Sequence, residues 1–327
     1  MRPFSGAFIV AALAGVFGCK AERVLVVASA VGVDGGPGDA MVIPTDAGDD
    51  QSDVDAADGG NDVGGSGWTP FGTPQIVTGL RSDTDVVEDP ALTFEETELY
   101  FVSPTSGMND IWVSRRTAVS DPWGPSTLVT ELSSPQNDED PEVSVDGLFM
   151  YFTSDRGGVG RHLYVSQRRT RDTPWETPMR VDLGSSTLDA APALDRSQLL
   201  LVFASGRGAA SVPHLFSTTR DPGGNWQSPT EITALSSGYI DSDPALFSDG
   251  RAIVFSSRRL TQGGAADLFQ AARTDVSVPF ASSLAPITEL NGTSSTSEED
   301  PWMSQNGRHI LFVSDRNGRK RIYEATR

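Results

Sequence analysis

Short apolar runs flanked by turn residues are the most regular feature of the chain. Three of them read LFMYFTS (148–154), RAIVFSS (251–257) and HILFVS (309–314). They are apolar at consecutive rather than alternate positions, which is typical of a strand covered on both faces. Each run closely follows a pair that favours a tight hairpin, because Gly and Asn tolerate a positive φ angle. These pairs are Asp146-Gly147, Asp249-Gly250 and Asn306-Gly307.

The hairpins recur five times at a nearly constant spacing. A Pro marks the first strand of every copy, at intervals of 51, 51, 52 and 57 residues: Pro90, Pro141, Pro192, Pro244 and Pro301. A Phe stands eleven residues after each Pro, and a Ser stands two residues further on. The five Phe are Phe101, Phe152, Phe203, Phe255 and Phe312, and the five Ser are Ser103, Ser154, Ser205, Ser257 and Ser314. This register indicates a repeated structural unit.

Two further strands complete each unit. The third ends in an apolar–aromatic pair such as Leu163-Tyr164, and the fourth opens with an aromatic residue and a Pro, such as Trp175 with Pro178. Pro suits an outer strand, where one N–H faces solvent. Four strands at this period are typical of a propeller blade. The sequence therefore predicts an all-β fold over residues 68–327, a five-bladed β-propeller with four antiparallel strands per blade.

The fifth unit has no fourth strand of its own, because the chain ends at Arg327, just past the third. A segment with fourth-strand character, PFGTPQIVTGL (70–80), instead precedes the first unit. We expect this N-terminal strand to complete the last blade and close the ring.

Residues 1–67 have a different character. Arg2 and a short apolar run that ends at Gly18-Cys19 resemble a bacterial lipoprotein signal. This resemblance predicts a signal peptide over 1–18, acylation of Cys19, and a lipid-anchored protein of the bacterial cell envelope, in the outer membrane or periplasm. The alternative is a secreted protein, cleaved after Ala28-Ser29-Ala30. Residues 19–67 are rich in Asp and Gly, which predicts a disordered tether.

Charge narrows the range of partners. The net charge is -19 at pH 7, which excludes nucleic acid and anionic membrane surfaces as partners. Membrane contact is therefore expected only through the anchor. The single cysteine excludes an internal disulfide.

Acidic residues follow the repeat and define a candidate site. Because strand direction alternates, the start of the first strand, the turn between strands two and three, and the crossover between blades share one face. The candidates on that face are Glu88, Asp89, Glu139, Asp140, Asp189, Asp243, Glu299 and Asp300. Such a ring around a channel mouth would suit Ca²⁺ or a basic peptide. Alternatively, each carboxylate caps its turn or pairs with an Arg of the same face, from the set Arg156, Arg207, Arg259 and Arg316.

No other cofactor is expected. His162, His214 and His309 lack a Cys or a carboxylate at ligand spacing, so the sequence predicts no zinc site.

The repeat resembles the TolB-type propeller repeat, a WD-repeat-like family of bacterial envelope proteins. The residues that carry the resemblance are clearest in the fifth copy: Asp300-Pro301, Asn306-Gly307, Phe312, Ser314-Asp315-Arg316, Gly318 and Ile322-Tyr323. The resemblance covers nearly all of residues 84–327 and implies a propeller in the cell envelope.

Two functions stay open at this point. One is a monomeric binding or scaffold propeller that recognises a protein or a glycan through its loop face. The other is a carbohydrate-active enzyme, a glycosidase or lyase, which would use a pair of carboxylates at the channel mouth. We favour binding, because the acidic residues recur with the repeat, whereas a catalytic pair would break its symmetry. None of the GxSxG, HExxH or P-loop motifs occurs.

Overall fold

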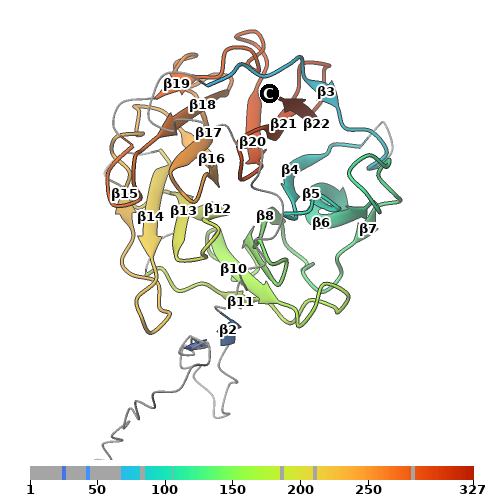
Figure 1. The fold of residues 1–327 in the computed structure, drawn as a ribbon, viewed down its shortest axis with the longest axis vertical. Coiled ribbons are helices and arrows are strands. Elements are labelled where there is room, and N and C mark those ends of the chain that lie inside the picture. Colours follow the sequence, from blue (N-terminus) through green and yellow to red (C-terminus); the bar gives the residue numbers. More distant parts are fainter. Residues whose placement is uncertain are drawn as a thin grey trace, which may run out of the picture.

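The computed structural model describes residues 24–26, 42–44, 68–81, 85–105, 107–184, 188–208, 212–280 and 284–327. Five antiparallel sheets of four strands surround a central channel (Figure 1). This confirms the predicted five-bladed β-propeller. The predicted signal peptide, Cys19 and most of the predicted tether lie outside the described residues. N-terminal to the propeller, β1 (Val24–Val26) pairs antiparallel with β2 (Val42–Pro44). The described part of the chain contains no helix long and apolar enough to cross a membrane.

Each blade runs from an innermost to an outermost strand. Blade one contains β4 (Glu88–Leu92), β5 (Glu98–Thr105), β6 (Met108–Arg115) and β7 (Thr127–Leu128). Blade two contains β8 (Asp138–Val143), β9 (Phe149–Ser154), β10 (His162–Gln167) and β11 (Met179–Arg180). Blade three contains β12 (Asp189–Leu194), β13 (Leu200–Ser205), β14 (His214–Thr219) and β15 (Thr230–Glu231). Blade four contains β16 (Asp241–Phe247), β17 (Ala252–Ser257), β18 (Asp267–Ala272) and β19 (Ala285–Pro286). Blade five contains β20 (Glu298–Met303), β21 (His309–Ser314), β22 (Arg321–Thr326) and β3 (Gln75–Ile76).

The N-terminal strand closes the ring, as the sequence predicts. In blade five, β3 pairs antiparallel with the C-terminal strand β22 (Figure 1). Two backbone hydrogen bonds extend the pairing, from the Gly72 amide to the Thr326 carbonyl at 2.8 Å and from the Val77 amide to the Ile322 carbonyl at 3.0 Å. Closure leaves no sheet edge open between the first and last blades.

The second strand of each blade is the core of the molecule. All six residues of β9, β13 and β17 are buried, in agreement with their apolar runs. The five repeated Phe are fully buried, with an exposed fraction of 0%. In the hairpins before these strands, Gly147 and Gly307 have φ angles of +71° and +69°, as the predicted turns require.

A second repeated arginine, which sequence reasoning missed, fixes the outer strand. It follows the third strand of each blade: Arg116, Arg168, Arg220, Arg273 and Arg327. Each guanidinium carbon lies 4.1 to 4.6 Å from the centre of an aromatic ring that precedes the fourth strand. Each Nε donates to a backbone carbonyl of the turn between strands one and two, at 2.6 to 3.2 Å. The signal was present in the sequence, at intervals of 52 to 54 residues.

Candidate functional site: the central channel

The innermost strands share an irregularity at the repeated Asp-Pro step. In β8, the pairing with β9 shifts register between Glu139 and Glu142, and Asp140 lies inside the resulting bulge with φ of +52°. The other four innermost strands have the same shift, and the residue before Pro has φ between +48° and +51° in each. Asp adopts this left-handed conformation more readily than most residues. The bulge turns the side chain before each Pro toward the next blade.

The carboxyl groups in these bulges connect neighbouring blades. Asp89 Oδ2 accepts a hydrogen bond from the Asp140 amide at 3.1 Å, and Asp140 Oδ2 accepts one from the Ala191 amide at 3.1 Å. A hydrogen bond also links the side chains of Asp300 and Asp89. Asp243 instead accepts from the hydroxyl of Ser256 at 2.5 Å. Asp89, Asp140, Asp243 and Asp300 form what we call the aspartate ring, which Ala191 interrupts in blade three.

Burial and mutual repulsion raise the pKa values of three members of this ring, Asp89, Asp140 and Asp300. Burial, the charge of Glu88 and other nearby carboxylates raise the pKa of Asp89 to about 6. Burial and the charges of Asp89 and Asp243 raise the pKa values of Asp140 and Asp300 well above the usual range for Asp. These groups therefore carry less negative charge at neutral pH than their number suggests.

The structure divides the predicted acidic residues into separate sets. The residue three positions before the repeated Pro, and not the Asp directly before it, forms an ion pair with the arginine of the turn between strands two and three. In blade three, Arg207 Nη2 donates to Asp189 Oδ2 at 2.6 Å, and Arg207 Nε donates to the Ser205 hydroxyl at 2.9 Å. The matching pairs are Arg156 with Asp138, Arg259 with Asp241, and Arg316 with Glu298. Of the predicted site residues, only Asp189 belongs to this arginine-paired set. Its contact is the one that the sequence predicts as the alternative, a carboxylate paired with an arginine of the same face.

The residue two before Pro forms ion pairs on the outer side of the aspartate ring. Lys320 Nζ lies 2.5 Å from Glu88 and 3.5 Å from Glu299, and Arg161 pairs with Glu139. Burial alone would lower the pKa of Lys320, but the charges of Asp300, Glu299 and Glu88 raise it above the usual range. On the predicted face, two bases, Lys320 and Arg161, therefore offset part of the charge of the three glutamates.

The structure also brings together three of the predicted residues from blades four and five. One carboxylate oxygen each from Asp243, Glu299 and Asp300 lies within 4.8 Å of the others. This geometry suits an oxygen-binding cation such as Ca²⁺. Because Lys320 already lies beside Glu299, the Ca²⁺ site stays a prediction.

The central cavity extends from the aspartate ring toward the face opposite the predicted one. Its volume is about 660 Å³, in the range of small-ligand sites. The five repeated prolines line its wall, and the turns between strands one and two line its outer end. Phe94 in the first of these turns is exposed, with an exposed fraction of 48%.

Two wall residues break the symmetry of the repeat. The residue after the repeated Pro is Ala in blades one, three and four, but Glu142 in blade two and Trp302 in blade five. Glu142 accepts a hydrogen bond from the Leu194 amide at 3.1 Å, and burial raises the pKa of Glu142 to about 8. At neutral pH its carboxyl is protonated and can donate a hydrogen bond into the cavity. The sequence already contained this departure, but only the structure shows that it faces the channel.

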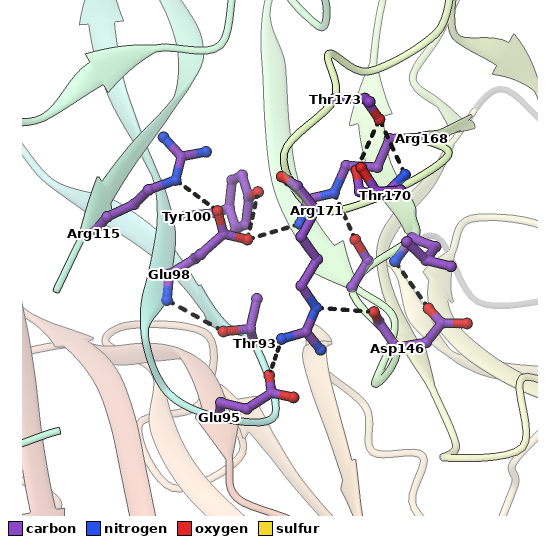
Figure 2. Close-up of polar contacts among 12 residues, drawn as sticks. Thr93, Glu95, Glu98, Tyr100, Arg115, Asp146, Arg168, Thr170, Arg171 and Thr173 are labelled. Atoms are coloured by element: carbon purple, nitrogen blue, oxygen red, sulfur yellow. Dashed lines mark hydrogen bonds and ion pairs between the residues drawn. The ribbon is translucent and has the colours of Figure 1, made fainter. Parts of the chain in front are cut away.

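A polar cluster between blades one and two also escaped sequence reasoning. Glu98 accepts from Arg115 at 2.6 Å, from Arg168 at 2.7 Å and from the Tyr100 hydroxyl at 3.3 Å (Figure 2). Burial would raise the pKa of Glu98, but the hydrogen bonds and charges of the two arginines lower it below its usual value. Glu98 and Arg168 lie 70 residues apart, so local spacing gave no sign of their contact.

Comparison with known proteins identifies the fold. No protein-family model and no curated protein matches the chain. TolB from Acinetobacter baumannii is a similar solved structure, with 17% identity and a TM-score of 0.49 over 74% of this chain. The chain spans about half the length of that protein, since the match covers 55% of it.

Two carbohydrate-active enzymes have slightly higher TM-scores. The catalytic domain of the Coprinopsis cinerea GH62 α-L-arabinofuranosidase is 11% identical, with a TM-score of 0.53, over 79% of this chain and 96% of its own. The endo-arabinase from Bacteroides thetaiotaomicron is 13% identical, with a TM-score of 0.53, over 79% of this chain and 98% of its own. At these identities the similarity shows the propeller fold alone.

Proposed function

We propose that this protein is an envelope-tethered binding propeller that receives a glycan in its central cavity. The observation that carries the proposal is the cavity of about 660 Å³ between the aspartate ring and the opposite face. Its wall offers the indole of Trp302, exposed Phe94 at its outer end and the protonated carboxyl of Glu142. Aromatic faces and a few converging polar groups favour a small polar ligand with apolar patches, such as a sugar chain.

The ion pairs on the face of the predicted acidic residues favour entry of the glycan from the opposite face, where the turns between strands one and two lie. On the other face, Lys320 and Arg161 engage the glutamates beside the aspartate ring. The lipid-anchor signal at Cys19 supports the tether, and Trp68, the first described residue of the propeller, lines the cavity.

A glycan array probed with the full chain tests the proposal, and two matched variants locate the site. Val145 lines the cavity, so Val145→Trp should fill its outer end and weaken binding at least tenfold. Val159 is 78% exposed on the opposite face, so Val159→Trp should leave binding unchanged. Loss in Val159→Trp alone would move the site to the face of the predicted acidic residues. Binding that neither variant weakens, or no binding to the array, would contradict the proposal.

The alternative is a glycosidase that uses Glu142 as its acid. Glycosidases need one protonated and one ionised carboxyl. Glu142 meets the first condition, but the aspartates of the ring recur with the repeat, whereas a catalytic pair would break its symmetry, and the pKa values of Asp140 and Asp300 move upward as well. Binding therefore has the stronger support. Release of reducing sugar from an array ligand, abolished by Glu142→Gln, would favour the enzyme instead.

A further inference from the structure

Three arginines surround the outer end of the cavity without a partner of opposite charge. Arg196, Arg251 and Arg308 come from the turns between strands one and two of blades three, four and five, and all three line the cavity. Among the described residues, none of the three forms an ion pair. Arg196 and Arg308 are exposed, and Arg251 is half-buried. By contrast, the buried Arg168 has an acidic partner, Glu98, at 2.7 Å.

The described acidic residues at the same end of the cavity have other partners or none, and they do not pair with these arginines. Glu96 is engaged by His309 at 2.9 Å, and Asp195 accepts hydrogen bonds from the backbone of its own turn. Asp249 lines the cavity beside Arg251. Hydrogen bonds from Ser277, together with the charges of Arg273 and Arg251, lower the pKa of Asp275. Among the described residues, neither Asp195 nor Asp249 forms an ion pair with the three arginines, so the guanidinium groups stay available to a ligand carboxylate.

The other end of the cavity has the opposite character. It is formed by the aspartate ring and Glu142. Burial raises the pKa of Glu142 to about 8 and raises the pKa values of Asp140 and Asp300 well above the usual range for Asp. Protonated carboxyl groups donate and accept hydrogen bonds as hydroxyl groups do. The cavity thus offers unpaired guanidinium groups at its opening and carboxyl groups that can form hydrogen bonds at its inner end.

We propose that the glycan is acidic, a uronate oligosaccharide whose carboxylates meet Arg196, Arg251 and Arg308 while its hydroxyl groups face Glu142 and the aspartate ring. The inference rests on the proposed function, because it assumes that a glycan enters the cavity. Guanidinium groups bind carboxylates through two parallel hydrogen bonds, so the arginines would select an acidic sugar over its neutral counterpart.

Phe94 supports the same assignment. The Arg196 guanidinium carbon lies 5.3 Å from the centre of the Phe94 ring, although the two residues come from blades one and three. This contact holds a cation and an aromatic face together across the opening. A sugar ring packed on Phe94 would place a carboxylate within reach of Arg196.

Calorimetric titration of the full chain with matched trisaccharides tests the inference. The probes are trigalacturonate and trimannuronate, and their neutral counterparts galactotriose and mannotriose. At least one acidic trisaccharide should bind ten times or more tightly than its neutral counterpart in 50 mM salt. The difference should shrink in 500 mM salt, because exposed charges are screened.

Paired variants separate specific recognition from general charge. Arg196→Gln with Arg308→Gln should remove the preference for the acidic trisaccharide and leave the affinity for the neutral one unchanged. The control is Arg169→Gln, an exposed arginine that does not line the cavity, and it should keep the preference. Equal affinity for acidic and neutral probes would overturn this inference and leave the proposed function intact. Binding of no probe at all would overturn both.

Discussion

Glu142 has an environment that couples the stability of the protein to pH. Its side chain is half-buried beside the channel, and loss of solvent around the carboxyl raises its pKa from 4.5 to about 8. In the unfolded chain the same carboxyl ionises near its ordinary pKa. Between these two values the folded state binds more protons than the unfolded state, so rising pH favours unfolding. The contribution of Glu142 to stability is therefore complete below about pH 4.5 and is lost as the pH rises through about 8.

We predict that Glu142→Gln stabilises the protein at pH 8 and has little effect at pH 4.5. Gln keeps the acceptor for the Leu194 amide but cannot ionise. The wild-type free energy of unfolding should fall by up to about 1.4 kcal/mol per pH unit for this one proton, and the variant should lack that slope. Urea unfolding at several pH values measures both, with the exposed Glu131→Gln as control. A constant difference between variant and wild type across this range would contradict the assignment.

The acidic residues show what residue spacing can and cannot reveal. Asp138 and Asp140 are two positions apart, so an undistorted strand would direct both side chains to one face. The bulge between Glu139 and Glu142 separates them: Asp138 pairs with Arg156, and Asp140 contacts the next blade. The acidic cluster could be predicted from the sequence. The bulge that divides it depends on a positive φ angle at the residue before Pro, which the repeated pattern does not predict.

At the scale of structural elements, the arginine of the turn between strands two and three connects four of the five blades to the crossover that follows the preceding blade. Arg207 donates to Asp189, to the Ser205 hydroxyl and to the Leu183 carbonyl at 2.8 Å. The Asp189 side chain has an exposed fraction of 5%, so its charge depends on this partner. The repeated Ser that the sequence singled out owes its register to this contact.

We predict that Arg207→Met destabilises the protein by about 3–5 kcal/mol, because it leaves a buried carboxylate unpaired. Adding Asp189→Asn should recover part of the loss, since the uncompensated charge is removed as well. Thermal and urea unfolding of both variants and of the exposed control Arg169→Gln provide the comparison. An equal loss in the single and double variants would show that the pairing of charges is not the cause.

Closure by β3 leads to a second prediction at this scale. Phe71, Val77 and Leu80 in and around that strand are buried, and each such side chain contributes about 1.5–3 kcal/mol. Deletion of residues 70–80 should therefore cost on the order of 5 kcal/mol and expose the edge of β22. Deletion of 29–67 should leave the melting temperature nearly unchanged. If both deletions destabilise equally, β3 does not have the closing role.

At the scale of the whole molecule, the sequence was informative about the fold and much less so about the site. Five copies of one pattern were enough to predict the number of blades, because each blade must bury the same apolar strand against its neighbours. The cavity depends on how five turns from distant parts of the chain converge around the channel. Arg196 and Phe94 contact each other across 102 positions, and neither belongs to the repeated pattern.

The position of Trp68 relates the cavity to the predicted anchor. Trp68 lines the cavity wall, so the segment that leads back to Cys19 joins the propeller near the cavity. Because Val24 pairs with Pro44, residues 19–24 and 44–67 set the reach of the segment, which would be at most roughly 100 Å if both were fully extended. This length would let the cavity reach glycans beyond the membrane surface. If Cys19 is acylated, the protein should sediment with membranes, and Cys19→Ala should either release it or block its processing.

Mass spectrometry of the mature N-terminus decides the point directly. An acylated Cys19 is the expected result, whereas an unmodified N-terminus at Val31 would establish the secreted alternative. The two outcomes also differ in function. A lipid anchor would concentrate the binding propeller at the cell surface, where many weak contacts with a glycan layer combine into strong attachment. A secreted propeller would have to bind as a single molecule, and the affinity of its one cavity would then set the limit.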